Sequence, residues 1–268
     1  MRRPLVLWII AIVITLASVV YQRMTGPTYP IRGAVEINGE KIKYRLLTTY
    51  VTDNDVRMEI NVPDRNISGE VKYKRYKSYD EWNIEPLPRD GDNLIVTLPK
   101  QPPAGKVMYQ IALIDASGGR YELSDKPVVI RFKGAVPGYI IIPHIIIIFM
   151  GMLLATRTGF EAIVNGPKSY VLTIWTTILL IVGGLIFGPL LQKFAFNEFW
   201  TGWPVGHDLT DSKTAFAVVF WLIALWRSRG VWKGRFWIIL AAVVTFIVYL
   251  IPHSVLGSEI DYTKASNI

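Results

Sequence analysis

Long apolar stretches divide the chain, and about a hundred residues of alternating apolar and polar positions separate the first stretch from the second. A helix rises about 1.5 Å per residue and the apolar core of a bilayer is about 30 Å thick, so about twenty apolar residues can cross it. The pattern therefore predicts a membrane α-helical protein with five transmembrane helices and an all-β domain inserted between helices 1 and 2. The five stretches are Pro4–Tyr21, Tyr139–Ala155, Tyr170–Leu191, Thr214–Trp226 and Phe236–Ile251.

Two of these stretches need a closer look. The fourth, Thr214–Trp226, spans a bilayer only if its helix begins near Asp211 and Lys213 extends its ammonium group to the interface. The first has the basic start and apolar run of a cleavable signal peptide. However, it is longer than a usual signal and ends in 19–23 (VVYQR) without the small residues of a cleavage site, which favours an uncleaved anchor.

Basic residues predict the orientation, because short loops rich in Lys and Arg stay in the cytoplasm. The start of the chain, the loop with Arg157 and Lys168, and the segment 227–235 are all basic, and five spans place all three on the same side. We therefore expect the N-terminus inside and the C-terminus outside. No eukaryotic targeting signal is present, so we expect the cytoplasmic (inner) membrane of a bacterium. The expected parts are an anchor (1–26), a periplasmic β domain (27–136), a four-helix membrane domain (137–253) with an outer loop (192–213), and a periplasmic tail (254–268).

The β domain is predicted from turn signals that recur about every ten residues, which is typical of a β-sandwich. One of them, Asn38-Gly39, tolerates positive φ and so favours a tight hairpin. The chain is long enough here to bury a core of its own. The predicted strands are Ile31–Ile37, Lys41–Tyr50, Val56–Val62, Gly69–Tyr76, Leu94–Leu98, Lys106–Asp115, Arg120–Leu123 and Val128–Lys133.

The segment Pro102–Ile111, followed by Ile114–Gly119, resembles an immunoglobulin or fibronectin type III module. In those folds a glycine-led strand with an inward tyrosine, here Tyr109, runs into a hairpin with an Asp…Gly turn. The resemblance covers the last half of the domain and lacks the paired cysteines and buried tryptophan of antibody domains, although Trp82 is available as a core residue. The resemblance implies an Ig-like sandwich with an adhesion, recognition or spacer role, and such sandwiches host many functions.

One stretch of this domain has two interpretations. Aromatic and basic residues alternate in it, and they would either form an exposed face that binds sugars, anionic lipid or glycan, or divide into inward aromatics and an outward lysine row. The second interpretation is favoured, because Lys72 and Tyr73 cannot both point inward on a strand. The residues of the binding face would be Tyr73, Tyr76 and Trp82, with Tyr79, Lys72, Lys74, Arg75 and Lys77 beside them.

The three histidines of the chain, His144, His207 and His253, are all predicted on or near the outer face. Imidazole binds zinc, copper and iron, so these residues with Asp208 are a candidate site for a divalent metal or haem. His144 lies among isoleucines within a span, where an ionisable side chain suggests a function. The alternative is hydrogen bonding at helix ends, to which Pro143 contributes a freed carbonyl.

The outer loop between the third and fourth spans is a second candidate. It carries an outer-face polar cluster beside His207, and the tail adds acidic residues on the same predicted side. Such carboxylates bind divalent cations or act as acid and base, but they also cap helices, and Thr210 or Asp211 is expected to cap the fourth span. The cluster comprises Asn197, Glu198, Asp211, Glu259 and Asp261.

Composition narrows the function. The chain has no cysteine, so neither a disulfide nor a thiolate is available. Part of the net charge of +8 is the orientation signal itself, so we expect no nucleic-acid function. No phosphate-binding loop, nucleophile elbow or inverted repeat is present, and the inner loops are too short for a catalytic domain. We therefore expect a protein that presents its β domain for partner binding or assembly of a membrane complex, with the bilayer and other membrane or periplasmic proteins as partners. The alternatives are a metal- or haem-binding protein and, third, a transporter or channel component.

Overall fold

The computed structural model describes residues 3–229, 234–252 and 257–264. The chain forms two compact units. The helical unit comprises Met1–Pro27 and Val136–Ser258, and the β domain comprises Thr28–Ala135 and Glu259–Ile268. The β-sheet region thus lies between the first and second long helices, as the sequence predicts.

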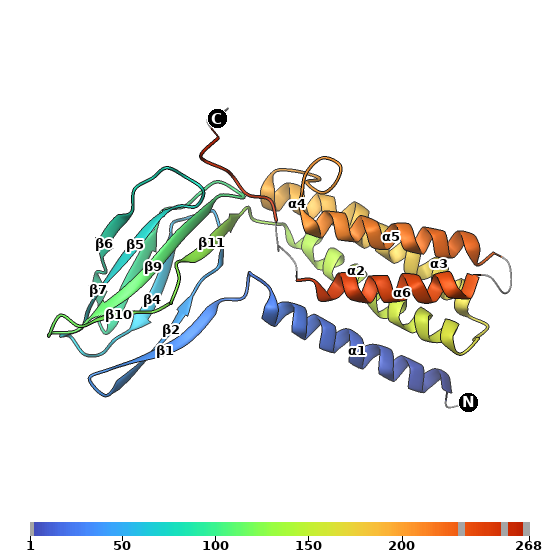
Figure 1. The fold of residues 1–268 in the computed structure, drawn as a ribbon, viewed down its shortest axis with the longest axis horizontal. Coiled ribbons are helices and arrows are strands. Elements are labelled where there is room, and N and C mark those ends of the chain that lie inside the picture. Colours follow the sequence, from blue (N-terminus) through green and yellow to red (C-terminus); the bar gives the residue numbers. More distant parts are fainter. Residues whose placement is uncertain (1–2, 230–233, 253–256, 265–268) are drawn as a thin grey trace. The chain divides into compact units, whose positions relative to one another are not determined.

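The β domain consists of short strands arranged in two sheets and a separate hairpin (Figure 1). The larger sheet has the order β3-β11-β9-β5-β6, and β10 also pairs with β9; the smaller has the order β4-β8-β7, and β1 pairs with β2. All pairs are antiparallel except β3 with β11. The strands are β1 (Ile31–Ile37), β2 (Glu40–Leu46), β3 (Thr49–Val51), β4 (Val56–Asn61), β5 (Ser68–Arg75), β6 (Asn83–Pro86), β7 (Arg89–Asp90), β8 (Asn93–Leu98), β9 (Lys106–Ile114), β10 (Arg120–Glu122) and β11 (Val128–Lys133).

The alternation in the sequence produces a single hydrophobic core. Every second residue of β4 is buried, starting from Val56, and the inward residues of both sheets and of β2 join one cluster. Tyr109 on β9 lies in this cluster with 0% of its surface exposed, and its hydroxyl donates a hydrogen bond of 2.9 Å to the carbonyl oxygen of Leu47. Its inward orientation is the one that the sequence predicts.

The structure differs from the prediction at three places in this domain. The predicted strand Lys41–Tyr50 is two strands, because β2 ends at Leu46 and β3 pairs with β11 instead of β1. The short strands β6 and β7 are additional. Trp82 is not part of the core: it directly precedes the edge strand β6 and lies partly exposed beneath two lysines.

The helical unit contains α1 (Arg3–Thr25), α2 (Gly138–Ile163), α3 (Ser169–Leu180), η1 (Ile181–Phe187), α4 (Gly188–Phe196), α5 (Leu209–Arg227) and α6 (Gly234–Leu250). Four helices are long and apolar enough to cross a membrane, namely α1, α2, the continuous helix formed by α3, η1 and α4, and α5. The fifth predicted span corresponds to α6, which has 17 residues. Many apolar side chains on these helices are exposed, as expected for contact with lipid.

Small residues let the helices approach closely. A Cβ atom on Gly159 of α2 would lie 2.7 Å from the Cβ of Ala242 on α6, and one on Gly184 of η1 would lie 2.5 Å from Thr214 on α5. At the centre of the unit, the buried Trp221 of α5 donates a 2.7 Å hydrogen bond to Thr245 of α6. Close packing is therefore the use of the glycines in the third span.

The start of the fourth span lies near Asp211, as the sequence predicts. Helix α5 begins at Leu209, two residues before Asp211, and is therefore long enough to span. Lys213 is 5% exposed and donates a 2.5 Å hydrogen bond to the carbonyl oxygen of Ile251, just after α6. A cation at this position complements the negative end of the α6 dipole.

Candidate functional site

Basic and aromatic side chains come together on the outward side of β5. Alternation along this strand turns Val71 into the core and Lys72 and Lys74 outward. The ammonium groups of Lys72 and Lys74 lie 5.6 and 5.5 Å from the centre of the Trp82 ring. These distances are those of cation–π interactions, so the two lysines and the tryptophan form one unit.

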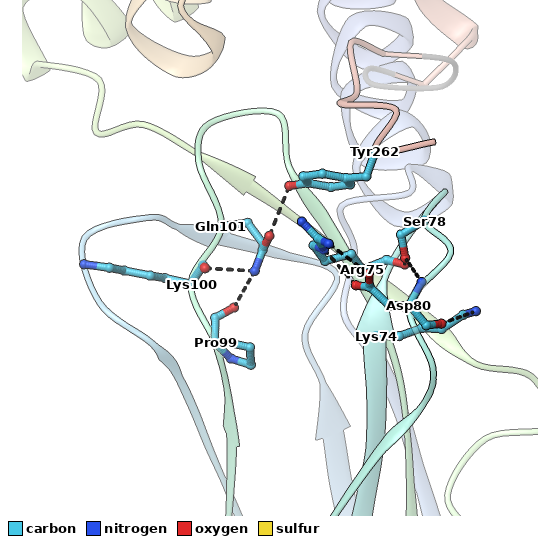
Figure 2. Close-up of polar contacts among 8 residues, drawn as sticks. All are labelled: Lys74, Arg75, Ser78, Asp80, Pro99, Lys100, Gln101 and Tyr262. Atoms are coloured by element: carbon cyan, nitrogen blue, oxygen red, sulfur yellow. Dashed lines mark hydrogen bonds and ion pairs between the residues drawn. The ribbon is translucent and has the colours of Figure 1, made fainter. Parts of the chain in front are cut away.

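The same surface continues around the β5–β6 turn, as Figure 2 shows. Lys74 donates to the carbonyl oxygen of Asp80, and the Asp80 carboxylate accepts two hydrogen bonds from Arg75, at 2.7 and 2.8 Å. The Arg75 guanidinium stacks on the ring of Tyr262, 4.6 Å from its centre. Tyr79 in this turn is 85% exposed. We name this surface the aromatic–basic face; it comprises Lys72, Lys74, Arg75, Tyr79, Trp82 and Tyr262.

The predicted binding residues separate on the two sides of β5. Tyr73 packs against the core, and its hydroxyl donates a 2.6 Å hydrogen bond to Glu85, which together with partial burial raises the pKa of Tyr73 to about 12. Tyr76 is paired with Lys106, 5.5 Å from its ring centre. Trp82 lies on the aromatic–basic face. Strand β5 therefore has a core side and an outward row of lysines, as the favoured interpretation predicts. The Trp82 ring lies with the lysines on the outward side.

The electrostatics of the aromatic–basic face favour a negatively charged ligand. Hydrogen bonds from Arg75 hold the pKa of Asp80 below its usual range, so this carboxylate stays ionised and engaged by Arg75. Lys72 and Lys74 add positive charge, and among the described residues neither forms an ion pair with a carboxylate. Since Arg75 is already paired with Asp80, the groups that remain for an acidic ligand are the two lysines over the Trp82 ring.

Residues of the tail belong to this domain and complete the face. Glu259 accepts hydrogen bonds from Lys77 and Lys106, and the backbone N–H of Ile260 donates to Ala104 at 3.2 Å. Tyr262 donates a 3.0 Å hydrogen bond from its hydroxyl to the side chain of Gln101 (Figure 2). The tail thus holds Tyr262 in place against Arg75.

The attachment of the tail is expected to depend on pH. Partial burial alone would raise the pKa of Glu259, but hydrogen bonds from Lys106 and Lys77 outweigh it and hold the pKa below its ordinary value. A depressed carboxylate pKa stabilises the folded arrangement above the unfolded pKa of about 4.3, and this stabilisation is lost as the pH falls through the folded value. We expect the hydrogen-exchange protection factor of the Ile260 amide to be constant from pH 7 to about 5 and to fall below about 4.

The variant Glu259→Gln should reproduce that loss at pH 7, with the protection factor of Ile260 reduced by about fivefold. Glu36→Gln, an equivalent change at an exposed position of β1, serves as the control and should leave the tail protected. Unchanged protection in Glu259→Gln would show that the two lysines do not hold the tail.

The outer loop of the helical unit contains a connected network of polar side chains. Asp208 is the N-cap of α5 and accepts a 2.8 Å hydrogen bond from the N–H of Thr210. Its other carboxylate oxygen accepts from the N–H and hydroxyl of Ser258, at 3.0 and 3.2 Å. Asp211 accepts from the N–H groups of Thr201 and Gly202 at 2.8 and 3.2 Å. The cap is therefore Asp208 and neither Thr210 nor Asp211, because Asp211 turns back to the loop.

The predicted polar cluster is distributed over both units. Asp208 and Asp211 lie in the network of the outer loop, where backbone and hydroxyl groups already use their oxygens. Asn197 ends α4 in a left-handed conformation with φ of 63°, and Glu198 beside it is exposed. Glu259 and Asp261 belong to the β domain, where Asp261 accepts hydrogen bonds from Thr263 in its own turn. In the helical unit the network ties the outer loop to Ser258, the residue before the tail.

The histidines have different environments. The ring nitrogen Nδ1 of His144 lies 3.0 Å from the carbonyl oxygen of Gly183 in η1, while His207 is exposed and His253 lies outside the described residues. Within residues 3–229, 234–252 and 257–264, no three His, Asp or Glu side chains are grouped so as to hold a metal ion. This carbonyl oxygen belongs to η1. It is not the carbonyl that Pro143 leaves free in its own helix. The metal or haem site, which includes His253, stays a prediction.

A buried ion pair was not among the predicted sites. Helix α2 continues to Ile163, beyond the predicted end at Ala155, so Arg157 lies within the helix and not in a cytoplasmic loop. It is 2% exposed and bonds at 2.7 Å to Glu161, which is 5% exposed. The guanidinium also lies 5.4 Å from the centre of the Trp8 ring of α1. The i, i+4 spacing of opposite charges beside an apolar run was the signal for this pair.

No protein-family model matches this chain, and no similar curated protein is found. The function is therefore inferred from the arrangement of the residues. The aromatic–basic face is the arrangement that points most directly to a ligand, since its charged and aromatic groups are adjacent and all at least partly exposed.

Proposed function

We propose that this protein is an inner-membrane subunit that presents an Ig-like β domain in the bacterial periplasm for partner binding or assembly of a membrane complex. The observation that carries the proposal is the aromatic–basic face, in which Lys72 and Lys74 share the ring of Trp82 and Arg75 stacks on Tyr262. Exposed aromatic and arginine side chains are the residues that most often dominate binding energy at protein interfaces.

The resemblance to Ig-like modules gains support from the second half of the domain. Tyr109 points into the core from β9, and β9 and β10 form a hairpin whose turn is organised by Asp115. One carboxylate oxygen of Asp115 accepts hydrogen bonds from the N–H groups of Ser117 and Gly119, both at 2.8 Å. Sandwiches of this kind serve many functions, so the fold alone does not identify a binding surface. We base that assignment on the aromatic–basic face.

The course of the chain supports presentation of the domain on one side of a membrane. The β domain includes chain on both sides of the segment Val136–Ser258. Before the segment comes the main part of the domain, and after it comes the tail, which contacts Lys77, Lys106 and Gln101 of that domain. Both ends of this segment therefore lead to the same side, which requires an even number of crossings. Helix α2, the α3–η1–α4 helix and α5 would make three crossings, so we propose α6 as the fourth, and its 17 residues are at the lower limit for a span.

The open edge of the larger sheet offers the partner a second contact. Strand β6 ends the order of this sheet, and all four of its residues are exposed, including Ile84 at 61%. Among the described residues, β6 pairs only with β5. A peptide segment of a partner can add to such an edge while its acidic side chains contact the neighbouring lysines. We therefore propose a partner protein with an acidic contact surface.

Co-purification from native membranes tests this function. The full-length protein, solubilised in a mild detergent, should retain a stoichiometric partner protein that is released as the salt concentration rises. The variant Lys72→Glu, Lys74→Glu, Trp82→Ala should lose this partner. The matched control Lys41→Glu, Lys43→Glu changes two exposed lysines of β2 in the same way and should retain it. Retention by the first variant, or loss by the control, would contradict the assignment of the face.

A further inference from the structure

The end of the helical unit opposite the outer loop contains a cavity of about 510 Å³. One side of it is formed by the α2–α3 loop and the start of α3, and the other by the end of α5 and the start of α6. This volume lies within the range of about 300–1,000 Å³ that is common for small-molecule sites. The cavity belongs to one unit and shares no residue with the aromatic–basic face.

The side chains around this cavity include two cations. Arg229 and Arg235 line it, together with Asn165, Ser169 and Ser228, and no acidic side chain is among the described residues of the lining. The guanidinium of Arg235 donates to the carbonyl oxygen of Ile163, the last residue of α2, which fixes the arginine at the cavity. The hydroxyls of Ser169 and Ser228 already donate to the carbonyl oxygens of Gly166 and Leu225. The donors that match the oxygens of a phosphate are therefore the two guanidinium groups and the Asn165 amide.

Two helices also begin at the cavity, α3 at Ser169 and α6 at Gly234. The first N–H groups of a helix have no partner within it, and they carry partial positive charge. At α3, the N–H of the N-cap residue Lys168 donates to the Glu161 carboxylate at 3.2 Å, and the N–H of Ser169 donates to the carbonyl oxygen of Gly166 at 3.4 Å. The anion site therefore depends on the two arginines and not on the start of α3.

The residues around the cavity are of the kinds found at the level of lipid head groups. Trp226, which is largely exposed, and Trp237 lie within a turn or so of Arg229 and Arg235, and the Arg227 guanidinium lies 4.7 and 5.9 Å from their ring centres. Tryptophan at the ends of membrane helices marks the interface between apolar core and water. Apolar residues at the base of the cavity, Ala162 and Ile238, suit the glycerol end of a lipid better than a free ion.

We propose that this cavity binds the phosphate of an anionic phospholipid head group, with Arg229 and Arg235 as its charged contacts. Basic pockets between membrane helices bind phospholipid head groups in this way. The site is independent of the proposed function of the β domain, since it requires only the helical unit.

Native mass spectrometry of the full-length protein in detergent, with phosphatidylglycerol as the probe, tests the proposal. We expect retention of one lipid by the wild type, and binding reduced by at least about tenfold in Arg229→Ala, Arg235→Ala. The control Lys41→Ala, Lys43→Ala removes the same charge from exposed lysines of β2 in the other unit, and it should bind as the wild type does. Equal losses in both variants would overturn the site, because they would indicate general electrostatic attraction.

Two further measurements are needed. The first shows whether the alanine variant loses lipid because of the site or because of misfolding, and the second shows whether the ligand is an anionic phospholipid or another molecule. Arg229→Lys, Arg235→Lys keeps the charge and should show intermediate binding, because lysine cannot form the bidentate contact. Phosphatidylcholine should bind at least about tenfold more weakly than phosphatidylglycerol, and excess inorganic phosphate should not displace the bound lipid. Displacement by phosphate, or equal binding of both lipids, would overturn the assignment to an anionic phospholipid.

Discussion

Replacing Tyr109 by alanine should unfold the β domain while the helical unit remains intact. Tyr109 is fully buried at the centre of β9, and its removal leaves a cavity in a core that both sheets share. The loss of a large buried aromatic side chain costs about 4 kcal/mol, a major part of the stability of a domain of this size. Hydrogen exchange of β9 amides in the full-length protein measures the opening free energy of the domain.

The variant Tyr109→Phe is the control for this prediction. It keeps the ring in the core and removes only the hydroxyl that donates to Leu47, so a loss of about 1 kcal/mol is expected. Protection of the α2 and α5 amides should be unchanged in both variants, since these helices belong to the other unit. If β9 amides in Tyr109→Ala exchanged as slowly as in the wild type, the core would not depend on this residue.

The variant Glu161→Gln should destabilise the helical unit by about 4 kcal/mol, because it leaves the Arg157 guanidinium buried without its counter-charge. In a unit of this size that corresponds to a fall of about 10 °C in Tm, measured by thermal denaturation of the detergent-solubilised protein. Two nitrogen atoms of Arg157, Nε and Nη1, already have no hydrogen-bond partner among the described residues, so the carboxylate of Glu161 is its main neutralising contact.

Replacing both Arg157 and Glu161 should lower the Tm much less than Glu161→Gln does. In Arg157→Leu, Glu161→Leu both charges are absent, and a well-packed apolar pair is often as stable as the ion pair it replaces. We expect a Tm within about 3 °C of the wild type for this double variant. A double variant as unstable as Glu161→Gln would indicate that packing of the side-chain stems, and not the unpaired charge, causes the loss.

Residue patterns predict the architecture because each pattern has a single dominant cause. The alternation in Val56–Asn61 and the apolar run of Gly138–Ile163 both follow from burial, in a core or in lipid, so the strands and the four long helices appear where expected. The short strands β6 and β7 could not be predicted in this way. They lie at sheet edges, where few of their residues are buried and the alternation is lost.

Details of the sites depend on three-dimensional neighbours that the sequence does not contain. Thr210, Asp208 and Asp211 are all chemically able to cap α5, and only the path of the loop gives that position to Asp208. The sequence left Trp82 available either for the core or for a binding face, and two lysines on β5 and an edge position keep it at the surface. The role of the tail was not predictable either, because Glu259 and Tyr262 are far in sequence from the residues they contact.

The most direct test of the central claim is to determine which parts of the chain share a side of the membrane. The protein has no cysteine, so single cysteines at Lys41, Lys264 and Asn165 can be labelled with a membrane-impermeant maleimide in sealed vesicles of one orientation. We predict that Lys41→Cys in the β domain and Lys264→Cys in the tail react from the same side. Asn165→Cys, between α2 and α3, should react only after the membrane is permeabilised. Labelling of Asn165→Cys together with Lys41→Cys from one side of an intact membrane would contradict a β domain presented by membrane-spanning helices.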